Sequence, residues 1–288
     1  MAGKYSIRFY KDQEVRAFRD EEHSKWWFSA IDIVWILSES KDPRKYWNKL
    51  SERLRSEWNE VVTNCHRLKM MAPDGKFRLT DVLDGDGIIL LAKNFPNHKG
   101  SDFLDWFLYS ENSIDGQSRK KAYALFEHNL VQEEDIGTTK ALQQIHAYLF
   151  WGLHEFAGKI RQKNISKGGF RFATAEFLDT PLQQIERMPE TTFDEIMNKY
   201  VEMNIAHPFM ERNWRTARIW LDLIFKKRLK KCVDWSKINK NDYLNAMIES
   251  VADATKIKKL IQGALTDKID DRDVFMKGID YSYYYEEE

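Results

Sequence analysis

The sequence has 288 residues, of which 43% are hydrophobic and 31% are charged, a composition typical of folded, soluble proteins. Its 45 basic and 45 acidic side chains cancel, which excludes a global field that would steer the chain to nucleic acid or to a membrane. Cys65 and Cys232 are too few for a disulfide framework, and no apolar run has the length of a signal-peptide core or a membrane span. We therefore expect a cytoplasmic protein of two domains with no membrane partner.

The first part of the sequence predicts an α+β domain. Residues 7–10 and 15–18 alternate between apolar and polar side chains, with a turn candidate at 11–13, and residues 26–28 continue the strand pattern. Ser29 is placed to cap a helix over residues 30–37, and Pro43 can occupy the first position of a second helix. Basic side chains crowd residues 41–55, namely Lys41, Arg44, Lys45, Lys49, Arg53 and Arg55. Two short helices, the second one basic, indicate a helix-turn-helix-like reader of DNA, and a solvated charged face is the alternative.

The same region resembles the BRO-type N-terminal domain of phage antirepressors and related regulators. The resemblance covers about residues 5–109 and rests on residues 26–33, 40–47 and 74–82. It implies DNA binding through residues 41–55, and contact with a protein partner stays open. We assign residues 1–110 to this domain.

Residues 111–117 are polar, contain one glycine and predict a linker. From residue 118 to residue 288 the sequence predicts a mostly helical domain, because apolar residues recur at helical spacing. The exception is residues 167–173, where a Gly-Gly pair beside a short stretch of alternating apolar and polar residues predicts a β-hairpin.

The stretch 205–219 gathers a histidine, a carboxylate, an asparagine and the arginines Arg215 and Arg218 at the start of a predicted helix. A helix N-terminus offers unpaired N–H groups and the positive end of the helix dipole, which attract anions. Arg215 and Arg218 add charge for phosphate oxygens, and Glu211 is a candidate ligand for Mg²⁺. His207 is a candidate general base. Each residue alone also fits a structural role, as a satisfied histidine or a solvated arginine.

This stretch resembles the Fic signature, H-x-F-x-D/E-G-N-G-R-x-x-R. The positions that match are His207, Phe209, Glu211, Asn213, Arg215 and Arg218. The resemblance implies a protein adenylyltransferase, in which AMP moves from ATP to a Tyr, Thr or Ser hydroxyl of a target protein. His207 would then accept the hydroxyl proton and Glu211 would bind Mg²⁺. Asn213 and Arg215 would hold the α- and β-phosphates, and Arg218 the γ-phosphate.

The hairpin resembles the flap that docks the target protein in this family by adding a strand. Its residues are Gly168, Gly169, Phe170, Arg171 and Phe172. Together with the motif, this resemblance extends from about residue 116 to the C-terminus.

The sequence departs from the Fic signature at Arg212 and Trp214, which stand where the signature has glycine. Glycine lets a loop curl around phosphate with positive φ, and another residue forced into that conformation costs roughly 1–2 kcal/mol. Three outcomes stay open. The loop is blocked and the domain is an inactive scaffold for DNA or protein binding, or the nucleotide binds differently and another group is transferred, or both side chains point outward and activity survives. Reduced or absent adenylylation ranks first.

Residues 276–288 resemble the C-terminal inhibitory helix of one Fic subclass, whose motif is S/T-x-x-x-E-G/N. Ser282 and Glu286 are four residues apart and share one helix face. The resemblance implies that Glu286 pairs with Arg218 and withholds it from the γ-phosphate, whereas Glu287 departs from the motif. A solvated acidic tail is the alternative. The neighbouring tyrosines are candidates for self-modification, namely Tyr283, Tyr284 and Tyr285. A homo-oligomer that buries this helix is also compatible with the sequence.

Overall fold

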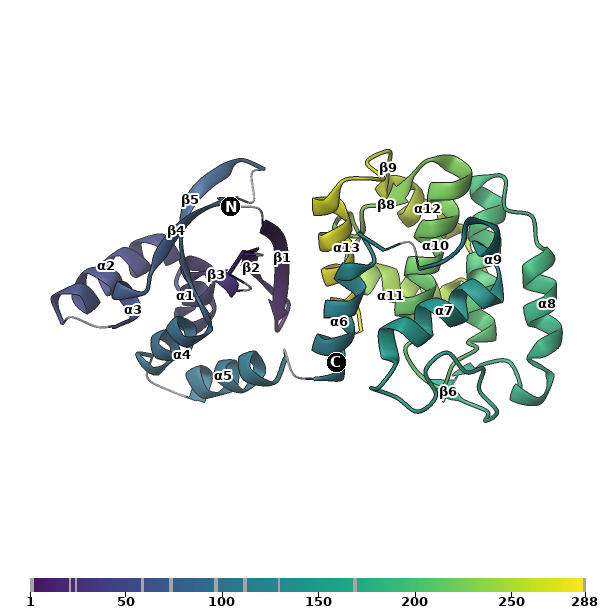
Figure 1. The fold of residues 1–288 in the computed structure, drawn as a ribbon, viewed down its shortest axis with the longest axis horizontal. Coiled ribbons are helices and arrows are strands. Elements are labelled where there is room, and N and C mark those ends of the chain that lie inside the picture. The colour runs from purple at the N-terminus through teal and green to yellow at the C-terminus, as the bar shows by residue number, and fades with distance from the viewer. Residues whose placement is uncertain are drawn as a thin grey trace. The chain divides into compact units, whose positions relative to one another are not determined.

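The computed structural model describes residues 3–286 apart from residues 21, 24, 58–59, 73–74, 96–97, 111–112, 129 and 168–169. Contacts divide the chain into an N-terminal unit, Met1–Ser113, and a C-terminal unit, Ile114–Glu288 (Figure 1).

The N-terminal unit is an antiparallel five-stranded sheet, in the order β1-β2-β3-β5-β4, with helices packed against it (Figure 1). The predicted strands and the first two helices are present at the predicted places. The strands are β1 (Gly3–Tyr10), β2 (Gln13–Asp20), β3 (Lys25–Ser29), β4 (His66–Met71) and β5 (Phe77–Leu83). The helices are α1 (Ala30–Ser38), α2 (Pro43–Ser56), α3 (Glu60–Thr63), α4 (Gly85–Lys93) and α5 (His98–Ser110).

Helix α2 packs against α1 and α3 and is tied to the sheet by a hydrogen bond. Trp47, 1% exposed, donates from Nε1 to the Asp81 carboxylate of β5 at 2.7 Å. The opposite face leaves its basic side chains in solvent, because 3.6-residue periodicity separates them from the buried stripe. These exposed residues are Arg44, Lys45, Lys49, Arg53 and Arg55.

The C-terminal unit is mostly helical, and α10 packs against α7, α9 and α13 (Figure 1). Its α-helices are α6 (Ile114–Ala124), α7 (Thr139–Phe150), α8 (Asp179–Arg187), α9 (Phe193–Ala206), α10 (Asn213–Leu229), α11 (Lys240–Glu249), α12 (Thr255–Ala264) and α13 (Arg272–Tyr284). Short 3₁₀ helices are η1 (Glu133–Asp135), η2 (Ala175–Phe177) and η3 (Trp235–Lys237). Two strand pairs are β6 (Ser166–Lys167) with β7 (Phe170–Arg171) and β8 (Cys232–Val233) with β9 (Leu265–Thr266).

The sequence predicts a linker over residues 111–117, but residues 114–117 form the first turn of α6. Asp115 in this turn accepts two hydrogen bonds from Arg215, a residue 100 positions along the chain. A polar stretch with one glycine gives no local sign of such a contact. Residues 111–112 lie outside the described residues.

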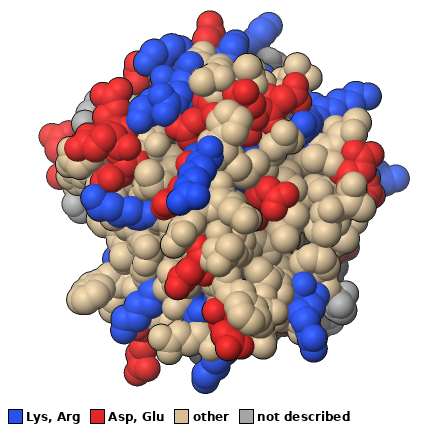
Figure 2. All heavy atoms as spheres, turned by 90° about the vertical axis from the view of Figure 1, so that its right-hand side faces the viewer, with Lys and Arg blue, Asp and Glu red and all other residues tan. Residues whose placement is uncertain are grey.

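The surface of the C-terminal unit mixes both signs of charge. Figure 2, which shows the face of this unit at the right of Figure 1, has Lys and Arg side chains interspersed with Asp and Glu. This agrees with the zero net charge of the sequence. Among the described residues, no helix is both long enough and apolar enough to cross a membrane.

Candidate functional site

The loop between α9 and α10 begins and ends at residues with left-handed backbone. His207, at φ 49°, ends α9 and donates its N–H to the Met203 carbonyl at 3.1 Å. Arg212, at φ 61°, directly precedes α10. Helix α9 starts, at its other end, with a capping box formed by Thr192 and Glu195.

Asn213 holds this loop closed. Its Oδ1 accepts the Phe209 N–H and its Nδ2 donates to the Phe209 carbonyl, both at 2.8 Å. The residue is 4% exposed. The sequence predicts a phosphate-binding role for Asn213, but in this structure both ends of its amide are engaged with the backbone, so it shapes the loop.

The two departures from the Fic signature differ in their backbone. Arg212 adopts the left-handed conformation that a glycine would take without strain, at a cost of roughly 1–2 kcal/mol. Trp214 lies within α10, where glycine is not required. Its indole ring is 6.5 Å from the ring of His207 and 6.5 Å from that of Tyr243, nearly perpendicular to both. Only position 212 therefore carries the backbone cost that the sequence suggests for both.

His207 presents one ring nitrogen to a backbone carbonyl. Nδ1 lies 3.2 Å from the Asn204 carbonyl oxygen. Because a carbonyl only accepts, Nδ1 carries the hydrogen in this contact, and Nε2 is then the nitrogen that can accept a proton. The ring stacks on Phe172 with centroids 3.8 Å apart. Phe172 follows β7 of the predicted hairpin, which is present, whereas Gly168 and Gly169 lie outside the described residues.

Arg161 joins the hairpin region to the loop. It is 3% exposed, and its Nε donates to the His207 carbonyl at 2.7 Å. Its backbone N–H donates to the Pro208 carbonyl at 2.8 Å, and NH2 donates to the Ala206 carbonyl at 3.1 Å and to the Ala173 carbonyl. The sequence gives no sign that the Arg161 guanidinium binds carbonyl groups of the loop.

Arg215 is surrounded by two carboxylates. Its side chain is 0% exposed, and its two terminal nitrogens donate to Asp115 at 2.6 and 3.1 Å. Its Nε lies 3.1 Å from Glu286 Oε2. Although burial opposes it, Glu286 and Asp115 raise the pKa of Arg215, so the guanidinium stays charged. Sequence reasoning missed Asp115.

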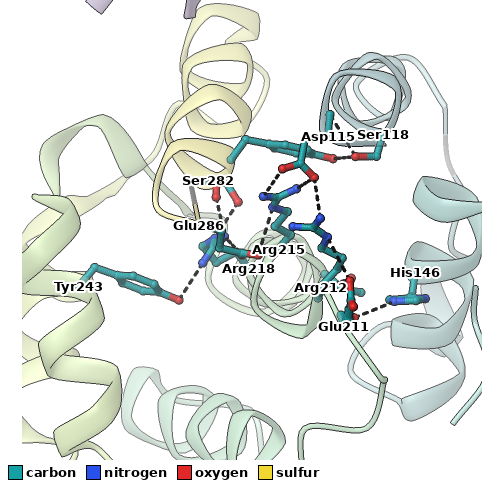
Figure 3. Close-up of polar contacts among 12 residues, drawn as sticks. Asp115, Ser118, His146, Glu211, Arg212, Arg215, Arg218, Tyr243, Ser282 and Glu286 are labelled. Atoms are coloured by element: carbon teal, nitrogen blue, oxygen red, sulfur yellow. Dashed lines mark hydrogen bonds and ion pairs between the residues drawn. The ribbon is translucent and has the colours of Figure 1, made fainter. Parts of the chain in front are cut away.

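Arg218 is equally enclosed (Figure 3). Its side chain is 1% exposed, with Nε donating to Ser282 Oγ at 2.7 Å and NH2 donating to the Ser282 carbonyl at 2.6 Å. NH2 also lies 2.5 Å from Glu286 Oε1, and NH1 lies 3.3 Å from Tyr243 Oη. The two oxygens of Glu286 are therefore shared between Arg215 and Arg218. The sequence predicts the contact of Glu286 with Arg218 but not its contact with Arg215.

Residues 137–225 match the model of the Fic/DOC family. This segment is a Fic/DOC domain. The match includes the loop with His207 and both arginines, whereas Asp115 and Glu286 lie outside the matched residues.

The chain is also similar to the protein adenylyltransferase VbhT of Bartonella schoenbuchensis, with 29% identity over 122 residues, which are 38% of this chain and 25% of that protein. It therefore spans about a quarter of the length of that relative. Similar solved structures include BepC of Bartonella tribocorum with bound AMPPNP, at TM-score 0.48 and 20% identity over 60% of this chain and 92% of that one. Another is a Fic domain of Bartonella quintana with bound ADP, at TM-score 0.45 and 19% identity over 55% and 85%.

Glu211 of the Fic domain fits the expected metal ligand. Its carboxylate is 57% exposed at the mouth of the loop, 4.0 Å from Arg212 Nε. Mg²⁺ is usually held by one or two protein carboxylates, with phosphate oxygens and water completing six ligands. A single exposed carboxylate suits that pattern.

His146 supports the Fic loop from α7. It is 0% exposed, and its ring stacks on Phe209 with centroids 3.9 Å apart. Nε2–H donates to the Glu211 carbonyl at 3.2 Å, and Nδ1 accepts the Gly158 N–H at 2.8 Å. Burial lowers the pKa of His146 to about 4, so the ring is neutral in the folded protein near pH 7. The sequence gives no signal for this role, since a histidine within an apolar helix face is usually a core residue.

We expect His146 to make the protein less stable in acid. Near pH 7 the imidazole is neutral in both states, but between pH 6.5 and 4 the unfolded chain binds a proton that the folded chain refuses, so stability is lost as pH falls. The loss is about 3 kcal/mol. Urea unfolding of wild type and His146→Gln at pH 7 and pH 4.5 measures it. Asp222, whose pKa is raised to about 6 by burial, acts in the opposite sense, so the difference between the two proteins isolates His146. Equal pH dependence in both would contradict this role.

Tyrosines of α13 and its end anchor it to α6 and η3 of the C-terminal unit. Tyr283 donates to Ser118 Oγ at 3.0 Å, and burial raises its pKa to about 12. Tyr285 donates to the Trp235 carbonyl at 2.6 Å. Both are 1% exposed, whereas Tyr284 is partly exposed. Tyr283 and Tyr285 can therefore act as acceptors of a transferred group only after α13 leaves its place.

Proposed function

We propose that the Fic domain transfers an adenylyl group from ATP to a hydroxyl side chain of a target protein, and that Glu286 restrains it. The observation that carries this proposal is the Glu286 carboxylate, whose two oxygens lie 3.1 Å from Arg215 and 2.5 Å from Arg218 (Figure 3). Two buried arginines at the first turns of a helix suit the oxygens of a polyphosphate. In this structure a carboxylate of the same chain occupies them.

The proposed reaction uses groups that the loop brings together. The hydroxyl oxygen of the target attacks the α-phosphorus of ATP, the bond from that phosphorus to the bridging oxygen breaks, and pyrophosphate leaves. The hydroxyl proton passes to Nε2 of His207, whose other nitrogen is oriented by the Asn204 carbonyl. The naming of VbhT as a protein adenylyltransferase supports this choice of reaction.

Each remaining side chain has a place in this proposal. Glu211 would hold Mg²⁺, which offsets the negative charge of the phosphates when bound. Arg215 and Arg218 would bind phosphate oxygens once Glu286 withdraws. The edge of the hairpin at Phe170, Arg171 and Phe172 would pair with an extended segment of the target, a frequent way for proteins to hold peptides.

The experiment uses ATP labelled at either the α- or the γ-phosphate, with the Glu286→Gly chain in a cell lysate. The proposal expects labelled protein from the α-label only. Label from γ alone would show phosphoryl transfer, and label from neither would exclude nucleotide transfer by this chain.

We propose a second function for the N-terminal unit, which is binding to DNA. The supporting observation is the outward face of α2, where Arg44, Lys45, Lys49, Arg53 and Arg55 are exposed while Trp47 fixes the helix to the sheet. A line of cations on a rigid helix suits the phosphate backbone.

We expect the full chain to bind duplex DNA with an affinity that falls linearly with the logarithm of salt concentration, because each neutralised phosphate releases a counterion. Replacing Lys45 and Lys49 by alanine should lower that slope by roughly one for each phosphate that the variant no longer neutralises. Fluorescence anisotropy with labelled DNA measures both effects, and Lys256→Ala in the C-terminal unit is the control. The absence of binding at low salt would contradict this function.

A further inference from the structure

We infer that Asp115 is a positioning residue for Arg215, and that Arg212, which replaces the glycine of the Fic signature, is the counter-ion of Asp115. This inference rests on the proposed function of the same site. It assigns a task to the most unusual residue of the loop and brings α6 into the site (Figure 3).

The two carboxylates around Arg215 contact different edges of its guanidinium. Asp115 accepts hydrogen bonds from the two terminal nitrogens of the guanidinium, NH1 at 2.6 Å and NH2 at 3.1 Å. Glu286 Oε2 lies 3.1 Å from Nε of the same side chain. An anion that replaces Glu286 therefore meets the Nε edge of an arginine whose other end is still held. Bidentate contacts of this kind fix the plane of a guanidinium as well as its position.

Arg212 balances the charge of Asp115. Its NH2 lies 3.2 Å from Asp115 Oδ1, the same oxygen that accepts from Arg215 NH1. Burial raises the pKa of Asp115, but Arg215 and Arg212 outweigh it and hold that pKa below its ordinary value, so the carboxylate stays ionised. Without Arg212, the negative charge of Asp115 would act more strongly on Arg215 and weaken its attraction for phosphate.

The charges of the whole cluster lead to the same conclusion. Arg212, Arg215 and Arg218 bring three positive charges, and Asp115, Glu211 and Glu286 bring three negative charges, which leaves no net charge. Withdrawal of Glu286 leaves one positive charge for a polyphosphate. With glycine at position 212 none would remain, so restoring the glycine of the signature would weaken nucleotide binding.

The test measures the affinity for ATP, without Mg²⁺, by calorimetry in the Glu286→Gly background. Arg212→Gly is expected to weaken ATP binding roughly tenfold, as loss of a charge near a buried pair does. Asp115→Asn together with Arg212→Gly is expected to return the affinity to within about threefold of the background, since both charges are gone. Lys256→Ala, which removes an exposed ion pair with Glu249, is the matched control and should change nothing.

A second measurement separates positioning from structural support. Asp115→Asn alone is expected not to raise KM for ATP, because it removes a negative charge, and to lower kcat of adenylyl transfer roughly tenfold, because an amide offers one acceptor oxygen to the guanidinium instead of two. A rise in KM with unchanged kcat would overturn the positioning role. An unchanged or tighter ATP affinity in Arg212→Gly, or no recovery in the double variant, would overturn the counter-ion role.

Failure of the proposed function gives a different result. If the Glu286→Gly chain binds ATP but transfers no label, the proposed transfer reaction is excluded. The ATP affinities of the single and double variants still test Arg212 and Asp115. If it binds no ATP, urea unfolding of the two single variants and the double variant tests the pair without nucleotide. The midpoint shift of the double variant is then expected to be smaller than the summed shifts of the singles, and additive shifts would overturn the inference.

Discussion

Replacing Glu286 by glycine is expected to tighten ATP binding and to raise adenylyl transfer by at least roughly tenfold, and up to several hundredfold. The estimate follows from the coupling of close, desolvated charge pairs, which is roughly 1.5–7 kcal/mol where it has been measured at protein interfaces. Glu286 makes two such contacts, with Arg215 and Arg218, both at most 1% exposed. ATP bound to wild type must first displace this carboxylate, whereas ATP bound to the variant does not.

The same substitution is expected to destabilise the protein in the absence of nucleotide. Removing one partner of a buried ion pair leaves uncompensated charge, at a typical cost of about 3–5 kcal/mol. Because ATP binds only the folded chain, it should then raise the Tm of the variant much more than that of wild type. Differential scanning fluorimetry with and without ATP checks this. Glu249→Gly, which removes an exposed carboxylate of α11, is the control. Equal Tm shifts in wild type and Glu286→Gly would contradict the restraint.

Replacing His207 by asparagine in the Glu286→Gly chain is expected to lower adenylyl transfer by roughly 10²–10⁴, the usual contribution of a general base. Asparagine is chosen because His207 has φ 49°, a conformation that asparagine tolerates better than alanine. The backbone of the loop is thereby kept while the basic nitrogen is lost. The rate of label transfer at saturating ATP measures the effect.

The affinity for ATP provides the control for this variant. His207 contacts Asn204 and Phe172, whereas Glu286 contacts Arg215 and Arg218, so ATP affinity is expected to stay within about threefold. A transfer rate within a factor of ten of the Glu286→Gly parent would exclude His207 as the base. A parallel loss of ATP affinity would place His207 in nucleotide binding.

Local patterns in the sequence predicted part of the fold. The alternation in residues 7–10 and 15–18, the cap at Ser29 and Pro43 at a first helical position correspond to β1, β2, α1 and α2. The hairpin near residue 170 and the loop before α10 are also where the sequence predicts them. These features depend on residues close together along the chain, whose periodicity and capping are visible in the sequence.

Contacts across long stretches of sequence explain the differences. Asp115 meets Arg215 across 100 residues, and neither residue's neighbours indicate it, so the sequence predicts a linker where α6 begins. The roles of Arg161 and His146 depend on backbone groups that come close only in the folded chain. The expected backbone strain at Trp214 is absent for another reason. Whether a glycine position needs positive φ depends on where the helix begins, and Trp214 already lies within α10.

The most direct test of the account compares wild type, Glu286→Gly and Glu286→Gly with His207→Asn in one lysate supplied with ATP labelled at the α-phosphate. The account predicts strong protein labelling by the single variant, and little by wild type, whose Arg215 and Arg218 are held by Glu286. The double variant should label no more than wild type does. Equal labelling by wild type and Glu286→Gly, or labelling that survives the loss of His207, would contradict it.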